Sequence, residues 1–115
     1  MDVSVDELDL MALPDVAARL DLPITRVHQL IRDGDVVAVS RPDQPRAIPA
    51  AFIGDEGPVK GLPAVITLLR DARYHDEEII DWLFRSDESL PGTPIQALRE
   101  NRGTEIKRRA QAAGF

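Results

Sequence analysis

The sequence predicts a mainly α-helical protein with a small β-hairpin, arranged as a winged helix-turn-helix followed by a helical C-terminal extension. Residues 13–39 have the pattern of two short helices joined by a tight turn and followed directly by a strand. After residue 58, apolar residues return at helical spacing in short segments separated by cap, glycine and proline signals. At 115 residues, the chain is long enough for one domain or two very small ones.

The first two helices are predicted from narrow apolar stripes, each of which would be buried against a neighbour. The turn between them is predicted at Asp21-Leu22-Pro23, because Pro23 disfavours a helical conformation at Leu22 and suits the first turn of a new helix. Gly34 can adopt a left-handed conformation and is expected to end the second helix, and the β-branched run 36–39 predicts a strand. The stripes consist of Val16, Ala17 and Leu20 in the first helix and of Val27, Leu30 and Ile31 in the second.

The exposed face of the second helix carries side chains that suit the reading of DNA bases. Guanidinium and amide groups match the edges of guanine and adenine in the major groove, and a threonine can reach a phosphate or a thymine methyl. We therefore expect this helix to contact DNA; the alternative is an ordinary exposed helix whose polar residues only keep the protein soluble. The predicted contacts are Thr25, Arg26, His28, Gln29 and Arg32.

A wing is predicted after the first strand. Residues 40–46 form a stiff loop with two prolines, and Ala47-Ile48-Pro49 is short enough for a second strand. In a winged helix-turn-helix this hairpin lies along the DNA backbone, and an arginine at its tip can enter a narrow minor groove. Arg41 and Arg46 are the predicted wing contacts. The alternative is a surface hairpin in which both arginines balance Asp43 and neighbouring acids.

The second half is predicted to be a series of short helices. One should open at Gly61-Leu62-Pro63, and the next should follow an Asp76 N-cap and largely bury Trp82. Cap and proline signals then predict helices at 94–100 and 105–113. The expected organisation is a flexible acidic N-terminal arm at residues 1–11, a winged DNA-binding domain at 12–53 and a helical C-terminal domain at 59–115.

The net charge of −6 argues against a nucleic-acid partner, because nucleic-acid-binding domains are usually basic. The acids are unevenly distributed, however. Residues 1–11 hold four acids and no base, whereas residues 12–53 hold five of each. The predicted reading unit is therefore neutral, and its affinity for DNA should be modest and strongly dependent on salt.

The composition of the chain argues against several other classes of function. The chain has no cysteine for a disulfide or a thiolate metal site, and no apolar run approaches the length of a membrane span. An acidic start differs from the basic start of a secretory signal, so a cytoplasmic protein without a membrane partner is expected. His28 and His75 are far apart in sequence and no phosphate-binding glycine loop occurs. We expect neither an enzyme nor a metal or cofactor.

With these residues in view, the chain resembles a small family of actinobacterial winged-helix DNA-binding proteins. The resemblance covers about Leu13 to Ala113 and implies a winged helix-turn-helix fused to a family-specific helical C-terminal region. The mycobacterial member is a Ser/Thr protein kinase substrate, which implies a kinase as a further partner. The N-terminal arm here has no threonine and offers only Ser4. The matching runs are LPDVAARLDLP, VHQLIRDGDVVAV, AIPAAFI, VKGLPAVITLLRDARYHDEEIIDWLF and EIKRRAQA.

A second, weaker resemblance favours another class. The run WLFRSDESLPGTPIQAL is similar to the toxin-binding region of antitoxins that pair a helix-turn-helix with a helical partner domain. The main prediction remains a sequence-reading protein that binds double-stranded DNA and regulates transcription, with the antitoxin-like protein as the alternative. A single reading helix buries little surface, so a homodimer or a protein partner bound through the C-terminal helices is also expected.

Overall fold

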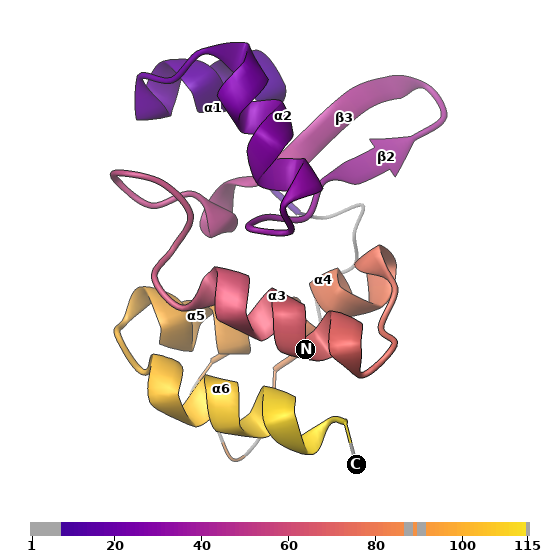
Figure 1. The fold of residues 1–115 in the computed structure, drawn as a ribbon, viewed down its shortest axis with the longest axis vertical. Helices are drawn as coiled ribbons and strands as arrows, with labels where there is room; N and C mark the ends of the chain where they lie inside the picture. Colours follow the sequence, from indigo (N-terminus) through magenta and orange to yellow (C-terminus); the bar gives the residue numbers. More distant parts are fainter. Residues whose placement is uncertain (1–7, 87–88, 90–91, 115) are drawn as a thin grey trace.

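The computed structural model describes residues 8–86, 89 and 92–114, which are arranged in two tiers (Figure 1). The upper tier contains α1, α2 and the strands, and the lower tier contains α3 to α6. This is the predicted architecture, a winged helix-turn-helix followed by a helical region. The described elements are β1 (Leu10–Ala12), α1 (Leu13–Leu20), α2 (Ile24–Arg32), β2 (Val39–Arg41), β3 (Gln44–Pro49), the 3-10 turn η2 (Ala50–Phe52), α3 (Leu62–Asp71), α4 (Asp76–Phe84), α5 (Pro94–Arg99) and α6 (Gly103–Ala112).

The helix-turn-helix forms where the apolar stripes and the turn residues predict it. Helix α1 ends at Leu20, and the left-handed backbone of its C-cap Asp21, at φ 54°, lets the chain reverse direction. Pro23 lies in the extended position just before α2 rather than inside its first turn, and the helix begins at Ile24. Gly34 follows the end of α2 at φ 79°, a conformation that glycine adopts without steric cost.

The first strand of the wing begins later than predicted. Val36 and Val37 are both buried and lie outside any strand, and β2 begins only at Val39. Successive side chains of a strand point to opposite faces of the sheet. Strand β2 lies at the edge of the sheet and is half-exposed, so two adjacent residues that are both buried cannot belong to it. The β-branched run therefore packs mostly into the core and contributes a single residue to the sheet.

The hairpin is tighter than the predicted loop. Arg41 pairs with Gln44, so that only two residues form the turn, and β3 starts three residues before the predicted second strand. The register shifts by one residue between this pair and the Val39–Ala47 pair. Pro45 lies within this irregularity, which accommodates it because proline has no amide hydrogen to donate to a ladder.

The sheet has a third strand that the sequence analysis missed. Strand β1 runs antiparallel to β3, with Met11 opposite Ile48, and the strand order is β1-β3-β2. The Ala50 amide donates to the Asp9 carbonyl at 2.9 Å, and Leu8 packs on the core. Residues 8–11, assigned to a flexible arm, are therefore part of the folded body; residues 1–7 lie outside the described residues.

The caps of the lower helices follow the predicted signals with one shift. Thr93 caps α5, since its hydroxyl accepts from the Gln96 amide at 3.3 Å. At α4 the N-cap position belongs to His75 rather than to Asp76, and the Glu78 carboxylate accepts from the His75 amide at 3.0 Å. His75 is thus a helix-start residue.

Two further predictions for the lower tier need correction. The last helix begins at Gly103, two residues earlier than predicted, and ends at Ala112. Trp82 is half-buried on the core rather than largely buried, because the inward face of α4 is occupied by Ile79, Ile80 and Leu83.

The two tiers share one hydrophobic core. The rings of Phe52 and Phe84 stack with their centroids 5.6 Å apart, joining the end of η2 to the end of α4. The Arg99 guanidinium on α5 donates to the carbonyls of Ala51 and Ile53 at 2.9 Å and 3.2 Å. These contacts join the upper tier, which contains the winged helix-turn-helix, to the helices of the lower tier. Among the described helices, none is both long and apolar enough to cross a membrane.

Candidate nucleic-acid interface

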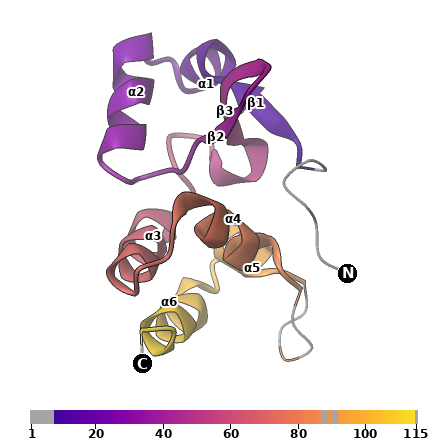
Figure 2. The same cartoon turned by 90° about the vertical axis from the view of Figure 1, so that its right-hand side faces the viewer.

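Helix α2 stands at an outer side of the upper tier, with β1 at the opposite side (Figure 2). Val27 is fully buried and fixes the inward side of the helix, and Leu30 and Ile31 pack half-buried on the same core. With 3.6 residues per turn, the remaining positions face solvent. The exposed side chains are Thr25, Arg26, Gln29 and Arg32, and His28 is half-buried at the edge of that face.

Two of these side chains are paired with each other. Nη1 of Arg26 donates to Oε1 of Gln29 at 2.9 Å, one helical turn away. The guanidinium has five N–H donors and the amide keeps its NH₂ group, so the pair retains most of its capacity to bind a partner. The hydrogen bond therefore holds two groups suited to base edges side by side on the exposed face of α2.

The wing is connected to this face through Arg46. Its side chain is exposed on β3, and its Nη2 lies 3.1 Å from Nδ1 of His28. A guanidinium can only donate, so Nδ1 is the acceptor in this contact. Residues 18 apart in the sequence are thus joined, and the wing cation lies at the edge of the exposed face of α2 formed by Thr25, Arg26, Gln29 and Arg32. We call this surface the reading face after its predicted role.

Arg41 lies in a different environment. It is half-buried, its Nη1 donates to Oε1 of Gln44 at 3.5 Å, and its Nε is buried. It also lines a hollow of about 450 Å³ between β2 and the start of α4, together with Asp76 and Glu77. Arg41 therefore borders the same hollow as the acidic start of α4 and is less exposed than Arg46.

The cations of the reading face are free of carboxylate partners among the described residues. Arg26, Arg32 and Arg46 form no ion pair among the described residues, whereas four arginines of the lower tier do. A positive charge without a neighbouring carboxylate is available to a phosphate. The lower-tier pairs are Arg70–Asp76, Arg85–Asp81, Arg102–Glu100 and Arg109–Glu105.

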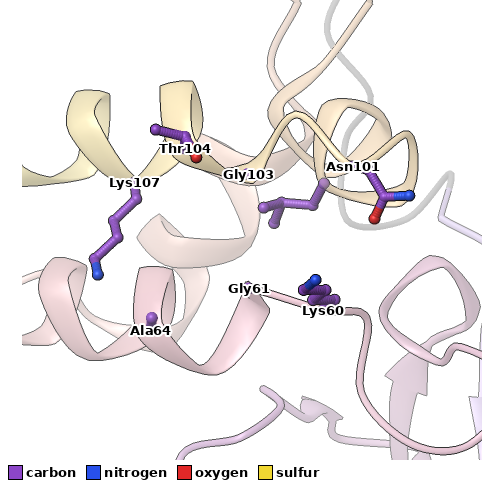
Figure 3. A pocket seen from close by; sticks show the side chains of 8 residues that line it. Lys60, Gly61, Ala64, Asn101, Gly103, Thr104 and Lys107 are labelled. Carbon is purple, nitrogen blue, oxygen red and sulfur yellow. The ribbon is translucent and has the colours of Figure 1, made fainter.

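A hollow of about 410 Å³ lies elsewhere, between the starts of α3 and α6 (Figure 3). Both lysines of the chain, Lys60 and Lys107, line it together with Thr104 and Asn101. It contains none of the predicted DNA contacts and belongs entirely to the helical tier. The reading face and this hollow are separate surfaces.

The structure brings most of the predicted residues together on one surface. Those of α2 share a face with Arg46 at its edge, whereas Arg41 is half-buried beside the hollow between β2 and α4. Sequence reasoning missed the contact between Arg46 and His28, because a pairing across 18 residues leaves no local signal. It also missed Ile24, which is exposed at the first position of α2; helical spacing places it beside Ile31 on the apolar stripe, so no local signal points to its exposure.

Comparison with known proteins gives two adjacent family matches. Residues 1–53 match the family described as "DNA-binding protein Rv2175c, wHTH domain", and residues 59–114 match "Rv2175c C-terminal domain of unknown function". The boundary between them coincides with the glycine- and proline-rich link at 54–58. The resemblance of residues 82–98 to antitoxins finds no support in these matches.

A curated relative and a solved structure agree with the family matches. The DNA-binding protein Rv2175c of Mycobacterium tuberculosis is 39% identical over 116 residues, which cover 90% of this chain and 79% of that protein. The NMR structure of Rv2175c superposes with a TM-score of 0.86 at 35% identity, covering 100% of this chain and 87% of that one. The protein therefore belongs to the family of the DNA-binding protein Rv2175c, with its winged helix-turn-helix domain followed by a C-terminal domain of unknown function.

Proposed function

We propose that this protein binds double-stranded DNA in a sequence-dependent way and regulates transcription. The observation that carries the proposal is the surface formed by the exposed polar face of α2 and the wing arginine Arg46, which contacts His28 at the edge of that face. A winged helix-turn-helix places its second helix in the major groove and its hairpin along the backbone. The family name supports the same partner.

The roles follow from the chemistry of each side chain. The guanidinium of Arg26 or Arg32 suits guanine, the amide of Gln29 suits adenine, and Thr25 can reach a phosphate. His28 contacts DNA at the edge of the groove or keeps Arg46 in place. Arg46 holds the backbone or enters the minor groove, and Arg41, being half-buried near Asp76, makes the weaker wing contact of the two.

The small number of free cations limits the affinity. On the face formed by α2 and the wing, three exposed arginines lack a carboxylate partner among the described residues, and these neutralise few phosphates. The logarithm of the binding constant should therefore fall with the logarithm of the salt concentration, at a slope of about −0.9 for each phosphate contacted. A homodimer that presents two reading helices would raise both the affinity and the length of the site. We place the contact for such a dimer, or for another protein partner, on the C-terminal helices.

In-vitro selection from random duplex DNA tests the proposal. We expect an enriched motif, and a two-fold palindrome would identify a dimer with half-sites spaced by about one helical turn. The Lys60→Ala variant, which removes a positive charge outside the proposed surface, should select the same motif. Failure to enrich any duplex over the random pool at low salt would contradict sequence-dependent binding.

We further propose that the acidic N-terminus competes with DNA for the arginines of the reading face. Asp2, Asp6 and Glu7 precede Leu8, the first described residue, and the carbonyl of Asp9 accepts a hydrogen bond from the Ala50 amide. Deleting residues 2–7 should tighten DNA binding at 0.01 M salt and do little at 1 M, because the Debye length falls from about 30 Å to about 3 Å. Fluorescence anisotropy with a labelled duplex measures both affinities.

A charge-only variant separates electrostatics from chain length. Asp2→Asn, Asp6→Asn and Glu7→Gln together keep the segment but remove its charge, and should reproduce the effect of the deletion. Phosphorylation of Ser4, which lies outside the described residues, would act in the opposite direction by adding about −1.5 to −2 charges. Equal tightening at both salt concentrations would show that charge is not the cause.

A further inference from the structure

Ile24 is the one large hydrophobic side chain that is exposed among the residues the structure describes. Its relative exposure is 41%, whereas the other large apolar residues in this part of the chain are buried or half-buried. A single exposed apolar residue is common on protein surfaces and needs no explanation by itself. The position of Ile24 in the fold gives it significance.

Ile24 is the first residue of α2. The N-terminal residues of a reading helix are those that contact base edges in the major groove. His28 lies one turn further along the same side of the helix and is in contact with the wing arginine Arg46. Ile24 is therefore at the leading end of the helix, on the side that faces the wing.

The core does not require an isoleucine here. Val27 makes the buried contact of α2, with Leu30 and Ile31 beside it, and Ile24 is not among the residues that pack on the hydrophobic core. A β-branched residue also has a lower helix propensity than alanine. Neither core packing nor helix formation explains why an isoleucine is present at this position. Contact with an apolar partner would explain it.

The major groove offers one apolar feature on its base edges, the C5 methyl group of thymine. We propose that Ile24 contacts this methyl group, and that the preferred duplex has a thymine opposite the start of α2. The inference rests on the proposed function and adds to it one base and one side chain. The other groups of the reading face are polar and select hydrogen-bonding edges, whereas Ile24 selects a methyl group.

The test replaces thymine by deoxyuridine, which removes the C5 methyl and keeps the base-pairing edge. Each thymine of a duplex obtained by selection is replaced in turn, and the dissociation constants of the wild-type protein and of Ile24→Ala are measured by fluorescence anisotropy. Loss of one buried methyl corresponds to about a fourfold weaker affinity. We expect one position to show this loss with the wild-type protein and no loss with Ile24→Ala.

Gln29→Ala is the matched control on the same helix. It should bind the selected duplex more weakly, yet remain sensitive to deoxyuridine at the position that Ile24 contacts. Because Ile24 is exposed, its alanine variant should keep the circular dichroism spectrum and melting temperature of the wild type.

Two results would overturn the inference and leave DNA binding intact. In one, the wild-type protein binds every deoxyuridine duplex as tightly as the parent duplex. In the other, Ile24→Ala remains as sensitive as the wild type at the same position. Failure to select any duplex at all would instead overturn the proposed function, so the two failures are distinguishable.

Discussion

Replacing Phe52 by alanine should lower the free energy of unfolding by about 3 to 5 kcal/mol, a large part of the total of about 5 to 15 kcal/mol that is usual for a domain. Phe52 is fully buried where the upper tier meets the lower one, and its ring stacks on Phe84. The substitution removes the ring, leaves a cavity and breaks this stacking. Urea denaturation followed by circular dichroism measures the change.

Phe84→Ala is the matched control for this prediction. It breaks the same ring pair, but Phe84 is only half-buried, so less apolar surface and a smaller cavity are involved. Its loss of stability should therefore be clearly smaller. An equal loss in the two variants would mean that the stacking, rather than the buried position of Phe52, supplies the stability.

The helix-turn-helix could be predicted from the sequence because its signals are local. Pro23 and Gly34 act on the backbone at or next to their own positions, and the stripe of α2 is visible at helical spacing. Thr93 is a further example, since a side chain that caps its own helix needs no information from elsewhere in the chain.

The sheet could be predicted only in part, because its pairings depend on distant residues. Strand β1 is three residues long and gains its hydrogen bonds from β3, which lies more than thirty positions later. Val36 and Val37 have high strand propensity, but the core buries both side chains and excludes them from the sheet. At these positions, tertiary packing rather than local propensity determines which residues belong to the sheet.

In the candidate site, too, the features set by local sequence could be predicted and those set by distant contacts could not. Exposure of Thr25, Arg26, Gln29 and Arg32 followed from the apolar stripe, because one face of a helix defines the other. The two wing arginines could not be distinguished by sequence. In the folded chain Arg41 is half-buried and borders a hollow that the acidic start of α4 also lines, whereas Arg46 is exposed beside α2.

Base-reading and backbone-holding residues should respond differently to substitution. Arg26→Ala or Gln29→Ala should cost about 1 to 3 kcal/mol of binding free energy on the selected duplex and reduce the preference among sequences. Arg46→Ala should weaken binding to all duplexes by a similar factor, because Arg46 is the proposed backbone contact. It should also reduce the salt slope by the amount that about one phosphate contact contributes. Titration of each variant against the selected duplex and a scrambled one measures both effects.

The hydrogen bond between Arg26 and Gln29 adds a second expectation to this experiment. Because the two side chains support each other across 2.9 Å, the double variant should lose less binding free energy than the two single losses combined. Lys60→Ala should leave the ratio between selected and scrambled duplexes unchanged, because its charge lies outside the reading face. If Arg26→Ala and Gln29→Ala instead weaken both duplexes equally, as Arg46→Ala should, then α2 holds the DNA backbone and does not read its bases.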